Sequence, residues 1–247
     1  MKKTTAFICF LAMSSFIYSQ DSPKKFQLGF HFSPNVSWLK ADSETIESDG
    51  AKLGFSYGVV ADFNIADNYA ISTGVNMLTS SVKYNYPDFQ NADGNPGEES
   101  GRSSADLRFR YVQIPVTLKL KTNQIGYMRY FGQFGLGLAV AYDATADTEF
   151  KYPGNDGTSS KEDVNFDSET NFFRASLIVG LGAEYNISGN TSILFGLTYD
   201  NGLTNVFGNE GFNEDQNGNA QTPRADNDDK EIKGFNNSIV LNLGVLF

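Results

Sequence analysis

The chain has 247 residues, of which 29 are acidic and 19 basic, and its formal net charge is −10. So acidic a chain is a poor partner for nucleic acid, whose binding depends on Lys and Arg that neutralise phosphates. The 24 glycines, 21 phenylalanines and 12 tyrosines favour strands, because aromatic side chains suit a pleated surface. The length allows one or two domains.

The N-terminal stretch has the pattern of a secretory signal peptide. Lys2 and Lys3 form a short basic region before an apolar run that is too short to span a bilayer. Ser19 is a small residue placed for cleavage, so we expect a signal peptide over residues 1–19 and a mature domain over residues 20–247. The alternative is an N-terminal membrane anchor.

Cleavage would also change what chemistry is open to the mature domain. It removes Cys9, the one cysteine of the sequence, so no disulfide can form. It removes two of the 19 basic residues, which leaves 17 against 29 acidic ones and a net charge of −12. No later run has the length of a transmembrane helix. The mature domain is therefore expected either to be soluble outside the cytoplasm or to cross a membrane with strands.

Alternation of apolar and polar residues with a period of two predicts eight strands. From Phe26 to Phe32, for example, the even positions are apolar and the odd positions polar or small. The third strand changes phase after Leu78, where we expect a bulge or bend. The eight predicted strands span residues 26–38, 55–65, 69–86, 112–120, 128–142, 173–185, 193–199 and 239–247.

The predicted connections alternate strictly between short and long. The short ones are residues 66–68, 122–126 and 186–190, and the long ones are residues 40–53, 87–106, 143–171 and 200–235. Transmembrane barrels have short periplasmic turns and long extracellular loops. The sequence therefore predicts an all-β fold, an eight-stranded antiparallel up-and-down transmembrane β-barrel in the outer membrane, with extracellular loops and periplasmic termini.

A soluble sandwich or barrel would instead point its apolar faces inward. Aromatic residues near the predicted strand ends favour lipid-facing surfaces, because such residues form girdles at membrane interfaces. They are Phe26, Tyr57, Phe63, Tyr69, Tyr127, Tyr130, Tyr142, Tyr185 and Tyr199. Phe247 ends the apolar face of the last strand, like the terminal aromatic residue that the assembly machinery reads in outer-membrane barrels. We expect outer-membrane lipid and that machinery as partners.

Two motifs resemble the PorT-like outer-membrane β-barrel proteins of Bacteroidetes. The run from Tyr111 to Val116 resembles their Tyr-(Leu/Val)-x-(Ile/Leu)-Pro-(Leu/Val) strand, and the run from Tyr199 to Val206 resembles their late Tyr-x-x-Gly-Leu-x-Asn-(Ile/Val) motif. The resemblance extends over the mature chain and implies an outer-membrane barrel. The family is named after a component of the type IX secretion system, so it also implies that role as an alternative. Its motifs are architectural and carry over no catalytic residue.

The polar face of the predicted strands carries charges that a barrel would enclose. Eight strands leave a lumen that side chains just fill, and buried charges need partners. We therefore expect a structural polar network that plugs the lumen, with most of its charges near the periplasmic end; a narrow ion path is the alternative. Its candidate members are His31, Asp62, Lys119, Lys121, Arg129, Arg174 and Glu184.

Enzymatic chemistry has little to build on in this sequence. A nucleophile–base pair would have to use His31, the one histidine, with Ser33 or Ser37 on the same face. We interpret His31 as a hydrogen-bonded lumen residue. We expect no enzyme activity and no cofactor.

A metal site is not expected either; a weak divalent-ion site on the last long loop, with Asp226, Asp228 and Asp229, is the alternative. Residues 213–218 resemble the start of an EF-hand calcium loop, but Arg224 stands where the bidentate Glu belongs. The predicted function is therefore a non-enzymatic structural or interaction role through the outer loops or the periplasmic rim. A type IX secretion component, a narrow pore and, last, a lipid-modifying enzyme are the alternatives.

Overall fold

The computed structural model describes residues 25–42, 46–90, 96–151, 158–167, 170–189, 191–208 and 233–247, without the side chains of 87–90 and 96–102. The predicted signal peptide and the candidate calcium loop lie outside the described residues.

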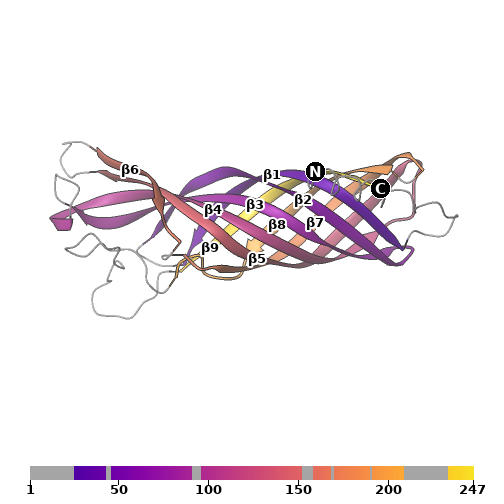
Figure 1. Ribbon diagram of the computed structural model, residues 1–247, viewed down its shortest axis with the longest axis horizontal. Coiled ribbons are helices and arrows are strands. Elements are labelled where there is room, and N and C mark those ends of the chain that lie inside the picture. Colours follow the sequence, from indigo (N-terminus) through magenta and orange to yellow (C-terminus); the bar gives the residue numbers. More distant parts are fainter. Residues whose placement is uncertain are drawn as a thin grey trace, which may run out of the picture.

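A closed ring of antiparallel strands dominates the described part of the chain (Figure 1). The strands are β1 (Phe26–Ala41), β2 (Glu47–Ala66), β3 (Tyr69–Gln90), β4 (Pro96–Lys121), β5 (Met128–Lys151), β6 (Thr158–Asn165), β7 (Phe173–Ser188), β8 (Thr191–Gly202) and β9 (Gly234–Leu246). Strands that follow one another in the chain pair, except that β7 pairs with β5 and not with β6, and β9 closes the ring on β1. Since β6 pairs only with β5, the ring has eight strands, which confirms the predicted barrel. Among the described residues, no helix is long and apolar enough to cross a bilayer.

The two ends of the ring differ, and we call them the short-turn end and the long-loop end. The short connections between β2 and β3, between β4 and β5, and between β7 and β8 define the short-turn end. The last residue, Phe247, is hydrogen-bonded to Leu28 near this end, with its N–H donating to the Leu28 carbonyl at 2.7 Å. The other connections lie at the long-loop end, and β3, β4, β5 and β6 project beyond the ring there (Figure 1).

Within the ring the outer surface is apolar and the lumen polar. On β4, Ile114 and Val116 point outward and are 48% and 47% exposed, whereas Lys119 points inward and is 1% exposed. The outward apolar run from Val112 to Leu120 spans nine residues, the length that a transmembrane strand needs. This arrangement is that of a barrel in lipid, and the soluble alternative does not fit it.

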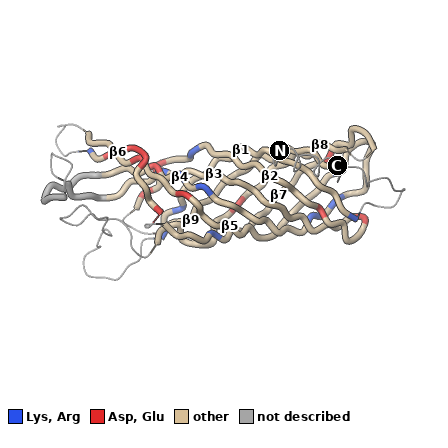
Figure 2. Tube along the Cα trace, viewed as in Figure 1, with Lys and Arg blue, Asp and Glu red and all other residues tan. Residues whose placement is uncertain are grey.

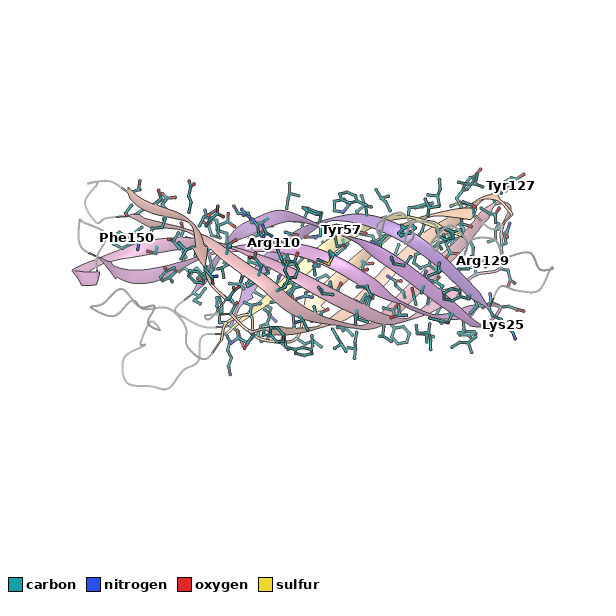
Figure 3. The ribbon with its side chains drawn as sticks, viewed as in Figure 1. Lys25, Tyr57, Arg110, Tyr127, Arg129 and Phe150 are labelled. Atoms are coloured by element: carbon teal, nitrogen blue, oxygen red, sulfur yellow. The ribbon has the colours of Figure 1, made fainter. Side chains whose placement is uncertain are left out.

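Exposed aromatic side chains lie near both ends of the outer surface, and others, such as Tyr57, lie between them (Figure 3). All nine aromatic residues singled out in the sequence are exposed. Near the short-turn end, the rings of Phe26 and Phe63 lie 5.0 Å apart, between centroids. Toward the long-loop end, Trp38 stacks on Tyr199 at 6.2 Å. The pairs at the two ends lie where a membrane barrel has its interfacial girdles.

The strands do not end where the sequence analysis placed the long loops. Residues 87–106 were expected to be a loop, yet β3 and β4 continue through much of it, and β5 runs to Lys151. The reason is a second pattern: above the ring the inward positions become apolar, with Val82, Tyr84 and Leu107 fully buried. These strands continue because they have a core of their own to cover.

The prediction of a bulge or bend in β3 near Leu78 is wrong. The pairing of β3 with β4 has no register shift from Tyr69 to Phe89, so the inward parity is unchanged. The irregularity lies in β2, between Ala51 and Phe55, where the pairing with β3 shifts by one residue. What changes along β3 is the polarity of the enclosed space.

Candidate functional site

The lumen near the short-turn end is filled by a buried ionic cluster that we call the plug. Lys119 Nζ lies 2.7 Å from Asp62 Oδ2 and 3.5 Å from Glu184 Oε1. Lys121 Nζ lies 3.0 Å and 3.2 Å from the same two oxygens. All four side chains are at most 5% exposed. Two cations thus share two carboxylates, which is the pairing that buried charges require.

Neighbouring side chains hold the plug in place. Ser72 Oγ donates to Asp62 Oδ1 at 2.6 Å. Lys119 Nζ lies 4.7 Å from the centroid of the Phe131 ring, a cation–π contact. The Phe131 ring has room only because Gly182 lies opposite: a Cβ there would come within 2.5 Å of the ring. Phe131 of β5 and Gly182 of the neighbouring strand β7 are paired, and the Phe131 ring fills the lumen at this level.

A vestibule of about 470 Å³ lies between the plug and the short-turn end. Its rim is solvent-exposed, as at Gln124 and Tyr127. It is lined mainly by amide and hydroxyl side chains, together with Arg129. The lining residues are Gln27, Asn64, Ala66, Asp67, Thr122, Asn123, Gln124, Tyr127, Arg129, Glu184, Asn186, Gly189 and Ser192.

Arg129 stands apart from the plug. It pairs in register with Glu184 across β5 and β7, but the Glu184 carboxylate binds Lys119 and Lys121 instead. Among the described residues, the Arg129 side chain has no hydrogen bond or ion pair, and its Nε is buried. Figure 3 shows Arg129 at the short-turn end, together with Tyr127 and Lys25. The sequence placed Arg129 at the correct end but in a network that it does not join.

His31 lies in the middle of the lumen. Its Nε2 donates to Asn76 Oδ1 at 2.7 Å, and its Nδ1 lies 2.9 Å from Ser33 Oγ. A small cavity of about 110 Å³ adjoins these groups and is also lined by Gln133 and Asn242. Ser33 is 0% exposed. A serine beside a histidine could serve acyl transfer, but this hydroxyl is enclosed between the plug and the layers above it.

Arg174 belongs to a second ionic layer, not to the plug. It is opposite Ala139 on β5, ten residues along the strand from Arg129, or about 33 Å at roughly 3.3 Å per residue. Its Nη2 donates to Asp200 Oδ1 at 2.6 Å and to the Asn236 carbonyl at 3.1 Å. Gln113 Nε2 donates to Asp200 Oδ2 at 3.2 Å.

Asp200 is a lumen residue that the prediction of a loop over residues 200–235 does not include. It is in fact part of β8, opposite Ile178 of β7. The signal was present: Phe195, Leu197 and Tyr199 point outward, so continued alternation puts residue 200 inside.

An apolar core closes the lumen above this layer, and we call it the cap. Tyr111 and Phe109 of β4 stack at 5.7 Å, and Tyr84 meets Phe207 edge-on at 5.3 Å. Its buried members include Leu39, Ile46, Leu78, Val82, Tyr84, Ala105, Leu107, Phe109, Tyr111, Ala139, Ala144, Ala146, Phe166, Val206 and Phe207. From the short-turn end upward, the lumen thus passes from vestibule to plug, polar middle, ionic layer and cap.

The outer surface around the cap is charged rather than apolar. Arg110 Nη1 lies 3.0 Å from Asp143 Oδ2, and Lys52 is ion-paired with Asp106. Lys83 Nζ lies 2.8 Å from Asp49 Oδ2, and its hydrogen bond holds the pKa of that exposed carboxyl below the usual range. Figure 2 shows acidic and basic residues together on this part of the sheet, near β4 and β6. Such a surface belongs in water.

The ring, its apolar exterior and its filled polar lumen define a membrane β-barrel. The sequence model of the family described as outer membrane protein beta-barrel domain matches residues 18–208. The chain belongs to that family, and this membership places it in the outer membrane. A search of curated proteins finds no significant match.

Several solved outer-membrane proteins resemble the chain in fold. Neisserial surface protein A is 14% identical with a TM-score of 0.41, over 92% of this chain and 98% of that one. OprG from Pseudomonas aeruginosa is 10% identical with a TM-score of 0.42, over 90% and 93%. The outer membrane protease OmpT from Escherichia coli is 9% identical with a TM-score of 0.37, over 94% and 99%. At such scores the fold class rests on the strand ring and the family match.

Proposed function

We propose that this protein is a non-enzymatic barrel that acts by structural support or by interaction at its projecting end. One observation carries the proposal: the part of the sheet beyond the ring has its own buried core and a charged exterior. A loop that only connected strands would not need the fully buried Leu107 and Phe109. A rigid, water-exposed projection suits contact with another molecule.

We propose that the projecting end is extracellular and that the short-turn end faces the periplasm. Long loops on one side and short turns on the other support this orientation. Residues 1–19 would then be the cleaved signal that directs export. Phe247, 43% exposed at the end of β9, would be the residue that the assembly machinery reads.

The finer family assignment is also a proposal. The PorT-like resemblance rests on the motifs from Tyr111 to Val116 and from Tyr199 to Val206. The positions of Tyr111 and Val206 in the cap give both motifs an architectural reason. A role in type IX secretion is therefore the second candidate, and it rests on these motifs alone.

A narrow pore is the third candidate, and the layered lumen argues against it. A test is conductance in planar bilayers with the purified full chain. We expect no conductance steps from the wild type. We expect none from a variant with Lys119, Lys121, Asp62 and Glu184 all changed to Ala, because the cap still closes the lumen. Steps from the wild type would replace the structural role with a pore.

The projection is tested by replacing residues 87–102 with a two-residue turn. Cells that carry the full chain or the shortened variant are treated with a membrane-impermeant crosslinker. We expect specific adducts of the full chain that the shortened variant lacks, while both fold and insert equally. A Lys25→Gln variant serves as the control, since it changes only the other end. Identical adducts from all three proteins would contradict an interaction at the projecting end.

A further inference from the structure

The vestibule at the short-turn end contains a cation whose donors are not used by the chain. Arg129 borders the cavity of about 470 Å³, its Nε is buried, and its side chain has no partner among the described residues. A buried donor without an acceptor is unfavourable, because no hydrogen bond offsets the loss of its hydration. The planar guanidinium presents a fork of N–H groups that matches a carboxylate.

The side chains at the base of the vestibule carry one more positive than negative charge. The plug contributes two cations and two carboxylates, and these neutralise one another through distances of 2.7–3.5 Å. Arg129 therefore adds an uncompensated positive charge at the base of the vestibule. The one other carboxylate in the lining is Asp67, which is exposed on the turn between β2 and β3. Solvent screens the charge of Asp67 more strongly than the charge of Arg129 at the bottom of the vestibule.

The rest of the lining is suited to neutral hydrogen-bonding groups. Side-chain amides of Gln27, Asn64, Asn123 and Asn186 come from four separate segments of the chain, and an amide group has both donors and acceptors. Each of these side chains has a partner within the chain; for Gln27, Asn123 and Asn186 these are Lys121, Asn68 and Gly189, and the amide hydrogen-bonding capacity beyond that partner is what a ligand would use. The cavity volume lies within the range of small-ligand sites, roughly 300–1,000 Å³.

We propose that the vestibule binds a small carboxylate-bearing ligand, with the carboxylate on Arg129 and its amide or hydroxyl groups on the surrounding Asn and Gln side chains. Two sources share this chemistry, the free C-terminus of a short peptide and a sugar acid. The site is independent of the proposed interaction at the projecting end, which lies at the other end of the barrel.

The test is isothermal titration calorimetry with the purified full chain in detergent. The probes are acetyl-alanyl-alanine, the same peptide as its C-terminal amide, and galacturonic acid. We expect at least one of the two acids to bind. If the peptide acid is the preferred ligand, its C-terminal amide should bind at least tenfold more weakly. Binding of galacturonic acid alone would assign the sugar-acid source.

Variants locate the site. Arg129→Gln is expected to weaken binding of the preferred acid at least tenfold, and Arg129→Lys to weaken it less because it keeps the charge but not the fork. Lys25→Gln is the matched control, an equal loss of charge at the same end outside the lining, and is expected to leave binding unchanged. If Arg129→Gln does not fold, the ¹⁵Nε resonance of Arg129 in the wild type should shift on titration with the acid. No binding of either acid, equal binding of acid and amide, or an equal effect of Lys25→Gln would overturn the proposal.

Discussion

Arg110 and Tyr111 are consecutive residues of β4 that face opposite environments. Arg110 points outward to an ion pair with Asp143, and Tyr111 points inward, where it is 1% exposed and lies 6.0 Å from the Arg174 guanidinium. Toward the short-turn end from this pair, the outside of β4 is apolar and the inside polar. Toward the long-loop end the order is reversed. This inversion marks where the barrel leaves the membrane and the projecting sheet begins.

The projecting sheet should lose stability when a side chain of its buried core is truncated. Phe109→Ala is expected to cost about 3–5 kcal/mol, the usual range for a buried Phe, and to loosen β3 and β4 above the ring. Hydrogen exchange followed by mass spectrometry would report faster exchange there and unchanged exchange within the ring. Arg108→Ala is the matched control, since its ion pairs are exposed and worth about 0–1 kcal/mol. Equal effects of both variants would contradict a separate core.

The plug should respond strongly to the loss of one charge. Asp62→Asn leaves Lys119 and Lys121 with Glu184 alone, and breaking a buried pair costs about 3–5 kcal/mol. Urea unfolding from lipid vesicles would measure the change in the free energy of unfolding. Asp67→Asn, on an exposed turn, should change it little.

The same network predicts that two substitutions together lower the free energy of unfolding by less than the sum of their separate effects. Adding Lys119→Met to Asp62→Asn restores charge balance, so we expect a coupling free energy of roughly 0.5–3 kcal/mol. Simple additivity in the double-mutant cycle would mean that the two side chains do not share one network.

His31 should matter for stability and not for chemistry. His31→Ala removes the partner of Asn76 inside the lumen, with an expected cost of about 1–3 kcal/mol in unfolding. Lipid extracts of cells with the wild type, His31→Ala or Ser33→Ala should be the same by mass spectrometry. A change in lipid composition common to both variants would reveal an enzyme.

The ring could be predicted from the sequence, because period-two alternation and the lengths of connections are local properties. It was insufficient for the projecting sheet, because alternation gives the parity of a strand and not which side is buried. Val82 and Tyr84 keep the inward parity of Ser72, yet they are apolar, and this was taken for a change of phase. The strand β6 has hardly any alternation of its own and forms by pairing with β5.

The polar lumen was predicted in part for a similar reason. The faces of β4 and β7 placed Lys119 and Glu184 inside, but parity alone does not give the height of a residue in the barrel. Register is what separates Arg174 from the plug and joins it to Asp200. The unpaired state of Arg129 likewise depends on distances across the lumen, which no local pattern contains.

The most direct test of the inversion uses spin labels along the outward face of β4. Single cysteines replace Asp106, Arg108, Arg110, Val112, Ile114 or Val116 in the chain without Cys9, and the labelled proteins are reconstituted in lipid vesicles. Electron paramagnetic resonance then compares collision with oxygen, which concentrates in lipid, and with a water-soluble nickel complex. We predict dominant nickel access at 106, 108 and 110 and dominant oxygen access at 112, 114 and 116. Oxygen access throughout, or nickel access at 114 and 116, would contradict a barrel that leaves the membrane between Arg110 and Val112.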